Sequence, residues 1–84
     1  MEYPGRVRRS TDADLAALRV TGASLRSMRR KRRLTQTGLA VVSGVNEKTI
    51  VNIEAARHIP RAETLRKLAA GLRCAVSDIA PTRG

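Results

Sequence analysis

The chain has 84 residues, enough for one small domain, and its single cysteine, Cys74, excludes a disulfide within the chain. One cysteine and one histidine fall short of the four ligands of a structural zinc site, so no metal or cofactor is expected. Seventeen Lys and Arg against seven Asp and Glu give a net charge of +10, which is typical of nucleic-acid binders. The only aromatic residue is Tyr3, which argues against the aromatic platforms that bind single strands. Without a signal peptide or an apolar run of about 18 residues, a cytoplasmic, nucleoid-associated duplex-DNA binder is expected.

The first 22 residues are expected to form a basic N-terminal arm with a short helix. Residues 1–11 combine a Pro-Gly pair with three arginines and show no apolar period, which indicates a flexible segment. Acidic residues at positions 12 and 14 follow a Ser-Thr pair and predict the start of a helix. Because Gly22 interrupts the pattern, we expect this helix to end there.

From residue 23 to residue 84, apolar positions recur at the helical period and predict an all-α domain of about five helices. Thr35 and Asn46 are the expected N-caps of two short helices, and Gly44 provides the left-handed residue between them. Pro60 suits the entry to the next helix. The predicted helices cover residues 23–32, 36–43, 47–56 and 62–72, with a last short helix around residues 76–79.

Two of these helices match the spacing of a helix-turn-helix over residues 36–55. Ala40 is small where the second helix crosses the first, and Gly44 takes the positive φ of the turn. Counted from Gln36, the matching positions 4, 5, 9, 15 and 18 are Leu39, Ala40, Gly44, Ile50 and Ile53.

Residues 25–79 resemble the lambda repressor/Cro-type (XRE) helix-turn-helix family of bacterial and phage regulators. The resemblance implies a five-helix, lambda-repressor-like domain that binds double-stranded DNA. The family often has glycine just past three helix ends, where this chain has Arg33, Ala56 and Arg73. The matching stretches are Leu25-Arg26-x-Met28-Arg29, Leu34-Thr35-Gln36, Leu39-Ala40-x-x-Ser43-Gly44-Val45, Thr49-Ile50-x-x-Ile53-Glu54, Pro60 and Thr64-Leu65-x-x-Leu68-Ala69.

The resemblance also implies which residues contact DNA. Gln36 is expected to bind a phosphate, with a solvated first-turn position as the alternative. Lys48 and Asn52 lie one turn apart on the outer face of the second motif helix and suit guanine and adenine edges, or else contact phosphates or solvent. Glu47 either accepts a hydrogen bond from cytosine or complements the helix dipole. The full expected set is Gln36, Asn46, Glu47, Lys48, Thr49, Val51, Asn52 and Arg57.

Arg29 and Glu54 match a family pair that bridges the first and third helices, and they are expected to form a structural ion pair. The basic run 29–33 is interpreted as a solvated helix face that attracts DNA, rather than as a nuclear localisation signal. The arginines of the arm either enter a minor groove or remain a solubilising tail. Cys74 is expected to be a small core residue rather than a redox sensor.

The sequence therefore predicts a sequence-specific transcriptional regulator, a repressor that acts as a homodimer on a near-palindromic operator. The alternative is an antitoxin, which would bind a cognate toxin and autoregulate its operon. No acid–base pair, phosphate loop or metal set supports an enzyme. The dimer surface is expected on the last two helices, because Val76 and Ile79 add more apolar surface there than a monomer needs.

Overall fold

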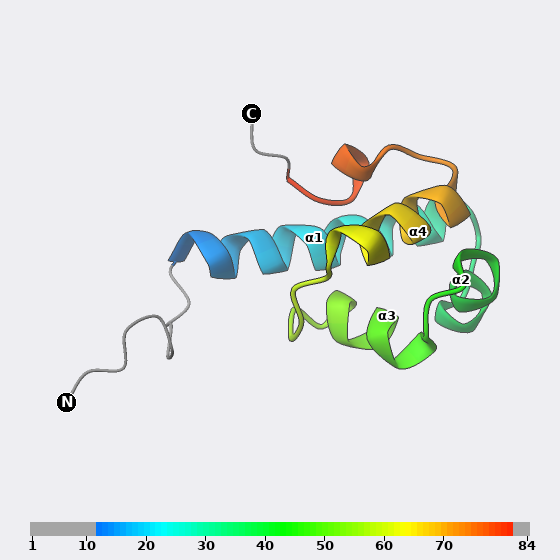
Figure 1. Cartoon of the computed structure of the whole chain (residues 1–84), viewed down its shortest axis with the longest axis horizontal. Coiled ribbons are helices and arrows are strands. Elements are labelled where there is room, and N and C mark those ends of the chain that lie inside the picture. Colours follow the sequence, from blue (N-terminus) through cyan, green and yellow to red (C-terminus); the bar gives the residue numbers. More distant parts are fainter. Residues whose placement is uncertain (1–11, 82–84) are drawn as a thin grey trace.

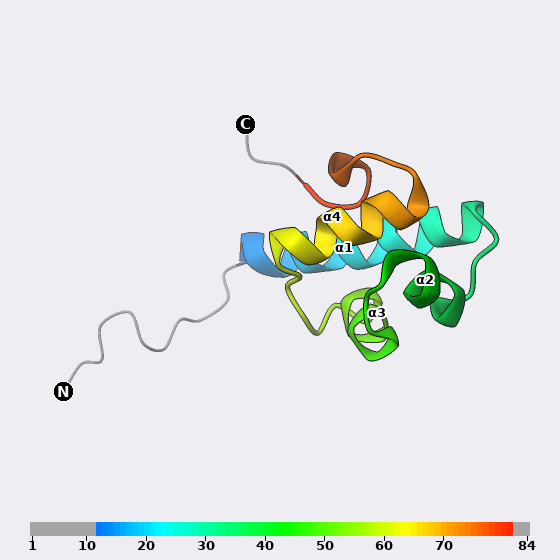
Figure 2. The same ribbon diagram turned by 45° about the vertical axis from the view of Figure 1, so that its right-hand side comes forward.

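The computed structural model describes residues 12–81, and this part of the chain is all-helical (Figure 1). Residues 1–11 of the predicted basic arm lie outside the described residues. Helix α1 is the longest element, α3 packs against it, and α2 packs against α3 and α4 (Figures 1 and 2). The elements are α1 (Asp12–Lys31), α2 (Gln36–Ser43), α3 (Glu47–Glu54), α4 (Ala62–Leu72) and a 3-10 turn, η1 (Val76–Asp78).

Helix α1 runs unbroken through Gly22, so the predicted helix end at this residue is wrong. Gly22 is buried against α3, and a Cβ built on it would lie 2.6 Å from the Ile53 carbonyl oxygen and 3.0 Å from that of Glu54. The glycine is therefore needed for close approach of two helices, not for a turn. Residues 12–31 form one helix, and the boundary that we expected between residues 22 and 23 falls inside it.

The helix-turn-helix motif has the predicted bounds for α2, and α3 ends two residues earlier than expected. Thr35 accepts a hydrogen bond from the Gly38 N–H at 2.9 Å, and Asn46 Oδ1 accepts one from the Lys48 N–H at 2.8 Å. Gly44 adopts φ 74°, in the left-handed region. Both caps and the turn were predicted, and all three are present.

Arg33, Ala56 and Arg73, which stand where the family often has glycine, all adopt left-handed conformations. Their φ angles are 58°, 59° and 57°. An L-residue in this region costs about 1–2 kcal/mol relative to the right-handed helix. The chain therefore keeps the backbone path of a glycine C-cap and bears a strain that glycine would remove.

One hydrophobic core joins all the helices, with Leu25 from α1, Leu39 from α2 and Ile50 from α3 completely buried. Ile79, which follows η1, is also completely buried, so its predicted place on a dimer surface is wrong. Val76 packs, partly buried, against the same core. The buried core cluster comprises Leu25, Leu39, Val45, Ile50, Ile53, Leu68, Ala69, Leu72 and Ile79. Between residues 12 and 81, no helix is long and apolar enough to cross a membrane.

Candidate nucleic-acid interface

The outer surface of α3 carries the predicted base-reading side chains. Ile50 and Ile53 anchor the opposite face in the core, which fixes the rotation of the helix. Lys48 is exposed and Asn52 is half-buried, and their spacing of four residues puts them on the same side, one turn apart. Both can therefore point toward a duplex laid along α3.

The other expected contact residues surround this pair. Asn46 and Glu47 are exposed at the N-terminal end of α3, where Asn46 acts as the cap and Glu47 lies in the first turn. Arg57 is exposed just beyond the C-terminal end. Thr49 and Val51 are half-buried, so each presents only part of its side chain outward.

A buried carboxylate joins the first three helices beneath this surface. The side chain of Glu54 is only 1% exposed. Arg29 of α1 donates from Nε to Glu54 Oε2 at 2.7 Å and from a terminal nitrogen to Oε1 at 2.9 Å, which is the bidentate geometry of a strong pair. Gln36 of α2 donates from Nε2 to the same Oε1 at 3.1 Å. The predicted Arg29–Glu54 contact is thus formed and extends to the motif's first helix.

The charge state of this network is firmly set. Burial alone would raise the pKa of the Glu54 carboxyl, but hydrogen bonds from Arg29 and Gln36, with the charges of Arg29 and Arg26, bring it below its ordinary value. Hydrogen bonding to Glu54 raises the pKa of Arg29 despite desolvation. The ion pair therefore remains charged across the neutral range and fixes α3 against α1.

Gln36 has a second role that sequence reasoning did not identify. Its side chain is half-buried, and one amide N–H is committed to Glu54. An amide nitrogen carries two N–H groups, so the second can still reach a phosphate. The start of α2 adds backbone N–H groups with no carbonyl partner inside the helix, a common site for phosphate oxygens.

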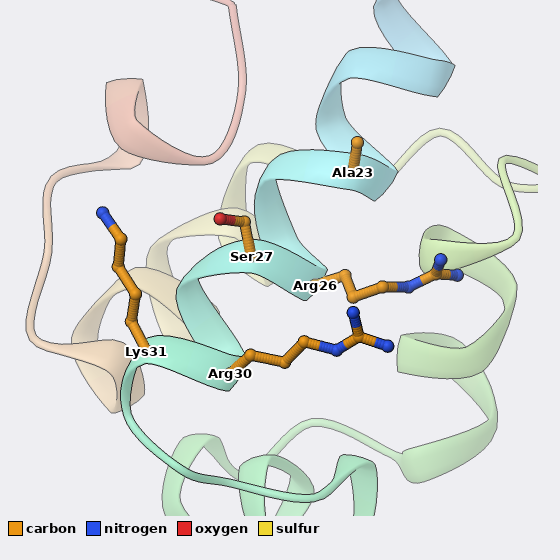
Figure 3. A pocket seen from close by; sticks show the side chains of 5 residues that line it. All are labelled: Ala23, Arg26, Ser27, Arg30 and Lys31. Carbon is orange, nitrogen blue, oxygen red and sulfur yellow. The ribbon is translucent and has the colours of Figure 1, made fainter.

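Two arginines of α1 extend toward α3 (Figure 3), and neither belongs to the set of DNA-contact residues expected from the sequence. Figure 3 shows Arg26 and Arg30 extended in the same direction, toward α3, whereas Lys31 points the other way. Arg26 Nε lies 3.5 Å from Glu54 Oε1, yet its side chain is 46% exposed, so its charge also faces solvent. Their spacing of four residues in a helix, with Arg26 three residues before Arg29, was the signal in the sequence.

The basic run 29–33 is only partly the solvated face that was expected. Arg29 is bound to Glu54 and donates to the Leu34 carbonyl oxygen at 2.9 Å. Arg32 donates from Nε to the Leu72 carbonyl oxygen at 2.8 Å and so ties the C-terminal end of α4 to α1. Arg30 and Lys31 are both exposed, as a solvated helix face requires, and their attraction of DNA stays a prediction.

The single cysteine and the single histidine of the chain both lie within the described residues. Cys74 is half-buried and packs against the core, and burial raises the pKa of its thiol, which disfavours the reactive thiolate. His58 is exposed in the loop after α3. Within residues 12–81, no three His, Cys, Asp or Glu side chains are grouped so that they could hold a metal ion.

Comparison with known proteins gives matches to helix-turn-helix proteins. A family described as helix-turn-helix domain matches residues 20–81. An uncharacterized HTH-type transcriptional regulator of Bacillus subtilis (strain 168), RghRB, is 41% identical over 64 residues, covering 75% of this chain and 46% of the relative. The chain thus spans about half the length of this curated relative.

Two solved structures share the fold. An HTH_3 family transcriptional regulator from Vibrio cholerae superposes with a TM-score of 0.76 at 27% identity, covering 79% of this chain and 37% of the other. The restriction-modification controller protein C.AhdI from Aeromonas hydrophila gives a TM-score of 0.73 at 26% identity, covering 76% of this chain and 97% of the other.

Proposed function

From the premise that this chain belongs to the helix-turn-helix domain family, with XRE-type transcriptional regulators as its relatives, we propose that it binds an operator sequence-specifically as a homodimer and represses transcription. The observation that carries the proposal is the outward face of α3. Lys48 and Asn52 lie one turn apart on this face, and Glu54 of the same helix anchors α3 to α1. Lysine suits guanine O6 and N7, and asparagine suits adenine N6 and N7.

Phosphate contacts on both sides of α3 complete the proposed interface. Gln36 and the first turn of α2 bind the backbone at one edge, and Arg26 and Arg30 add positive charge from α1. The other contributors on α3 and just beyond it are Asn46, Glu47, Thr49, Val51 and Arg57. A domain held across an operator excludes other proteins from the same duplex, which is the basis for proposing repression. The antitoxin alternative gains no support from the named relatives, which are described as regulators.

The proposal is tested by selecting binding sites from random duplex DNA and then titrating variants against the selected site and a scrambled duplex. Lys48→Ala and Asn52→Ala should each weaken binding to the selected site by about 1–3 kcal/mol. Binding to the scrambled duplex should be nearly unchanged, apart from the one charge lost at Lys48. Gln36→Ala should weaken binding to both duplexes, because a phosphate contact carries no sequence information, and it should also lower stability, because the hydrogen bond to Glu54 is lost.

A matched control is Lys67→Ala, which removes the same charge from the exposed face of α4. Lys67 forms only a surface pair with Glu63 at 3.7 Å, so its loss should have little effect on folding or site preference. If Lys48→Ala and Asn52→Ala lose as much affinity for the scrambled duplex as for the selected one, α3 does not read bases. Operator-dependent shut-off of a reporter promoter tests repression separately.

A further inference from the structure

Arg26 and Arg30, which we call the arginine pair, line a shallow depression on the surface of α1. The other lining residues are Ala23, Ser27 and Lys31, so the lining contains three cations and no carboxylate. The two arginines lie four residues apart and therefore on one side of the helix, and Figure 3 shows both side chains extended toward α3. Like charges at this spacing repel each other, so the arginine pair favours an anionic ligand between its side chains.

The carboxylate of Glu54 does not neutralise the arginine pair. Arg29 binds this carboxylate through two short hydrogen bonds of 2.7 and 2.9 Å. Arg26 Nε is more distant, at 3.5 Å from Glu54 Oε1. Arg30 is exposed, and its side chain forms no hydrogen bond or ion pair with any other residue of the described part of the chain. Three arginines thus surround one carboxylate, and positive charge remains beside α3.

Arg26 is held in position and keeps free hydrogen-bond donors. Its Nη2 donates to the Glu54 carbonyl oxygen at 3.4 Å, while Nε faces the Glu54 carboxylate. A guanidinium group has five N–H groups, so those of Nη1 remain available to a ligand, and the side chain is 46% exposed. A side chain that is already ordered loses less conformational entropy on binding, so Arg26 is prepared for a ligand that reaches it from solvent.

The arginine pair lies close to the expected path of the DNA backbone. In helix-turn-helix complexes the second motif helix enters the major groove and the first crosses the backbone. Gln36, at the start of the first motif helix, donates to Glu54 Oε1 at 3.1 Å. Arg26 Nε lies 3.5 Å from the same oxygen, so Arg26 and Gln36 are neighbours. A backbone that passes the start of α2 therefore also passes Arg26.

We propose that Arg26 and Arg30 together bind one phosphate of the operator backbone, an inference that rests on the proposed operator binding. The planar fork of a guanidinium group matches the oxygens of a phosphate, and each arginine can donate to a different oxygen. This direct contact differs from long-range attraction by a basic helix face. A direct contact depends on one phosphate, whereas long-range attraction depends on the total charge of the duplex.

The test replaces single phosphates of the selected operator by uncharged methylphosphonates and measures the affinity of the full chain for each duplex. In the wild-type protein, substitution of the contacted phosphate should lower affinity about tenfold or more, because hydrogen bonds to a charged group are lost. In Arg30→Ala that substitution should have little further effect. Arg26→Ala should lose the same penalty at the same position, because both arginines bind one phosphate.

Lys31→Ala is the matched control. It removes one charge from the position next to Arg30, but the Lys31 side chain points the other way (Figure 3). Lys31→Ala should therefore retain every methylphosphonate penalty of the wild-type protein. Arg26→Ala also loses its contacts with Glu54, so Arg30→Ala, which breaks no interaction among the described residues, is the decisive variant. Circular dichroism should show that all three variants remain folded.

The outcomes separate this inference from the proposed function. If Arg30→Ala retains every wild-type penalty, or if the two arginine variants lose penalties at different phosphates, the pair does not bind one phosphate, and base reading by α3 stands. If site selection yields no preferred duplex, the proposed function fails, and the salt dependence of binding to a scrambled duplex decides the arginine pair. There Arg30→Ala should make the slope of log affinity against log salt shallower by about one, and Lys31→Ala by less. Equal slopes for these two variants would overturn the inference.

Discussion

Replacing Gly22 by alanine tests the close approach of α1 and α3 on which the recognition surface depends. Helix propensity alone predicts that the substitution stabilises, since glycine inside a helix costs about 1 kcal/mol relative to alanine. The structure predicts the opposite sign. The new Cβ would lie 2.6 Å from the Ile53 carbonyl oxygen and 3.0 Å from the Glu54 carbonyl oxygen.

Both carbonyl oxygens belong to the backbone of α3, so they cannot rotate away as a flexible side chain would. The helices must instead separate, and overpacking of this kind costs typically about 1–3 kcal/mol, occasionally more. Taking a value of about 2–3 kcal/mol for a contact with two backbone atoms and subtracting the propensity gain leaves a net destabilisation of about 1–2 kcal/mol.

Urea unfolding followed by circular dichroism measures this difference directly. Ala23→Gly is the matched control, because Ala23 is exposed on the same turn and its substitution reports helix propensity without the contact. Both variants should be less stable than the wild-type protein, although Gly22→Ala removes a glycine from the helix and Ala23→Gly introduces one. If Gly22→Ala is as stable as wild type or more so, α1 and α3 do not approach as described.

Two further predictions concern the helix ends and the buried carboxylate. Ala56→Gly should stabilise the protein by about 0.5–1 kcal/mol because Ala56 has φ 59°, whereas Ala55→Gly, at φ −85°, should destabilise it in the same urea assay. In the folded protein the pKa of Glu54 is below its ordinary value of about 4.3, which also applies to the unfolded chain. The pairing of Glu54 with Arg29 therefore stabilises the fold fully above this unfolded pKa, and the contribution is lost as the pH falls through the lower folded pKa. Glu54→Gln should therefore cost on the order of 3 kcal/mol at pH 7, and its stability deficit should shrink in acid when unfolding is followed from pH 7 to pH 2.

The motif could be predicted from the sequence because its signals are local. Thr35 and Asn46 cap the helices that begin at the next residue, and Gly44 ends the helix just before it. The hydrogen bond that each makes reaches no more than four residues along the chain. Side-chain size at Ala40 and the apolar spacing of Ile50 and Ile53 then restrict how two short helices can cross. None of these inferences needs knowledge of a distant part of the chain.

The course of α1 could not be predicted in the same way. A glycine within a helical pattern has two interpretations, an end of the helix or a close contact, and local sequence favours the first. At Gly22 the second holds, because the contacting atoms are the carbonyl oxygens of α3, far along the chain. The role of Arg32 was missed for the same reason, since its partner is the carbonyl of Leu72.

Glu54 shows why the proposed DNA-binding surface depends on residues outside the helix-turn-helix motif. Its carboxylate binds Arg29 of α1 and Gln36 of α2 while it belongs to α3, so one buried charge fixes the mutual positions of three helices. Arg26 approaches the same carboxylate with its guanidinium nearly half exposed. A bound phosphate near Arg26 would therefore act on the network that holds α3 in place. On this argument, the residues that orient α3 and those proposed to bind the DNA backbone form one connected set.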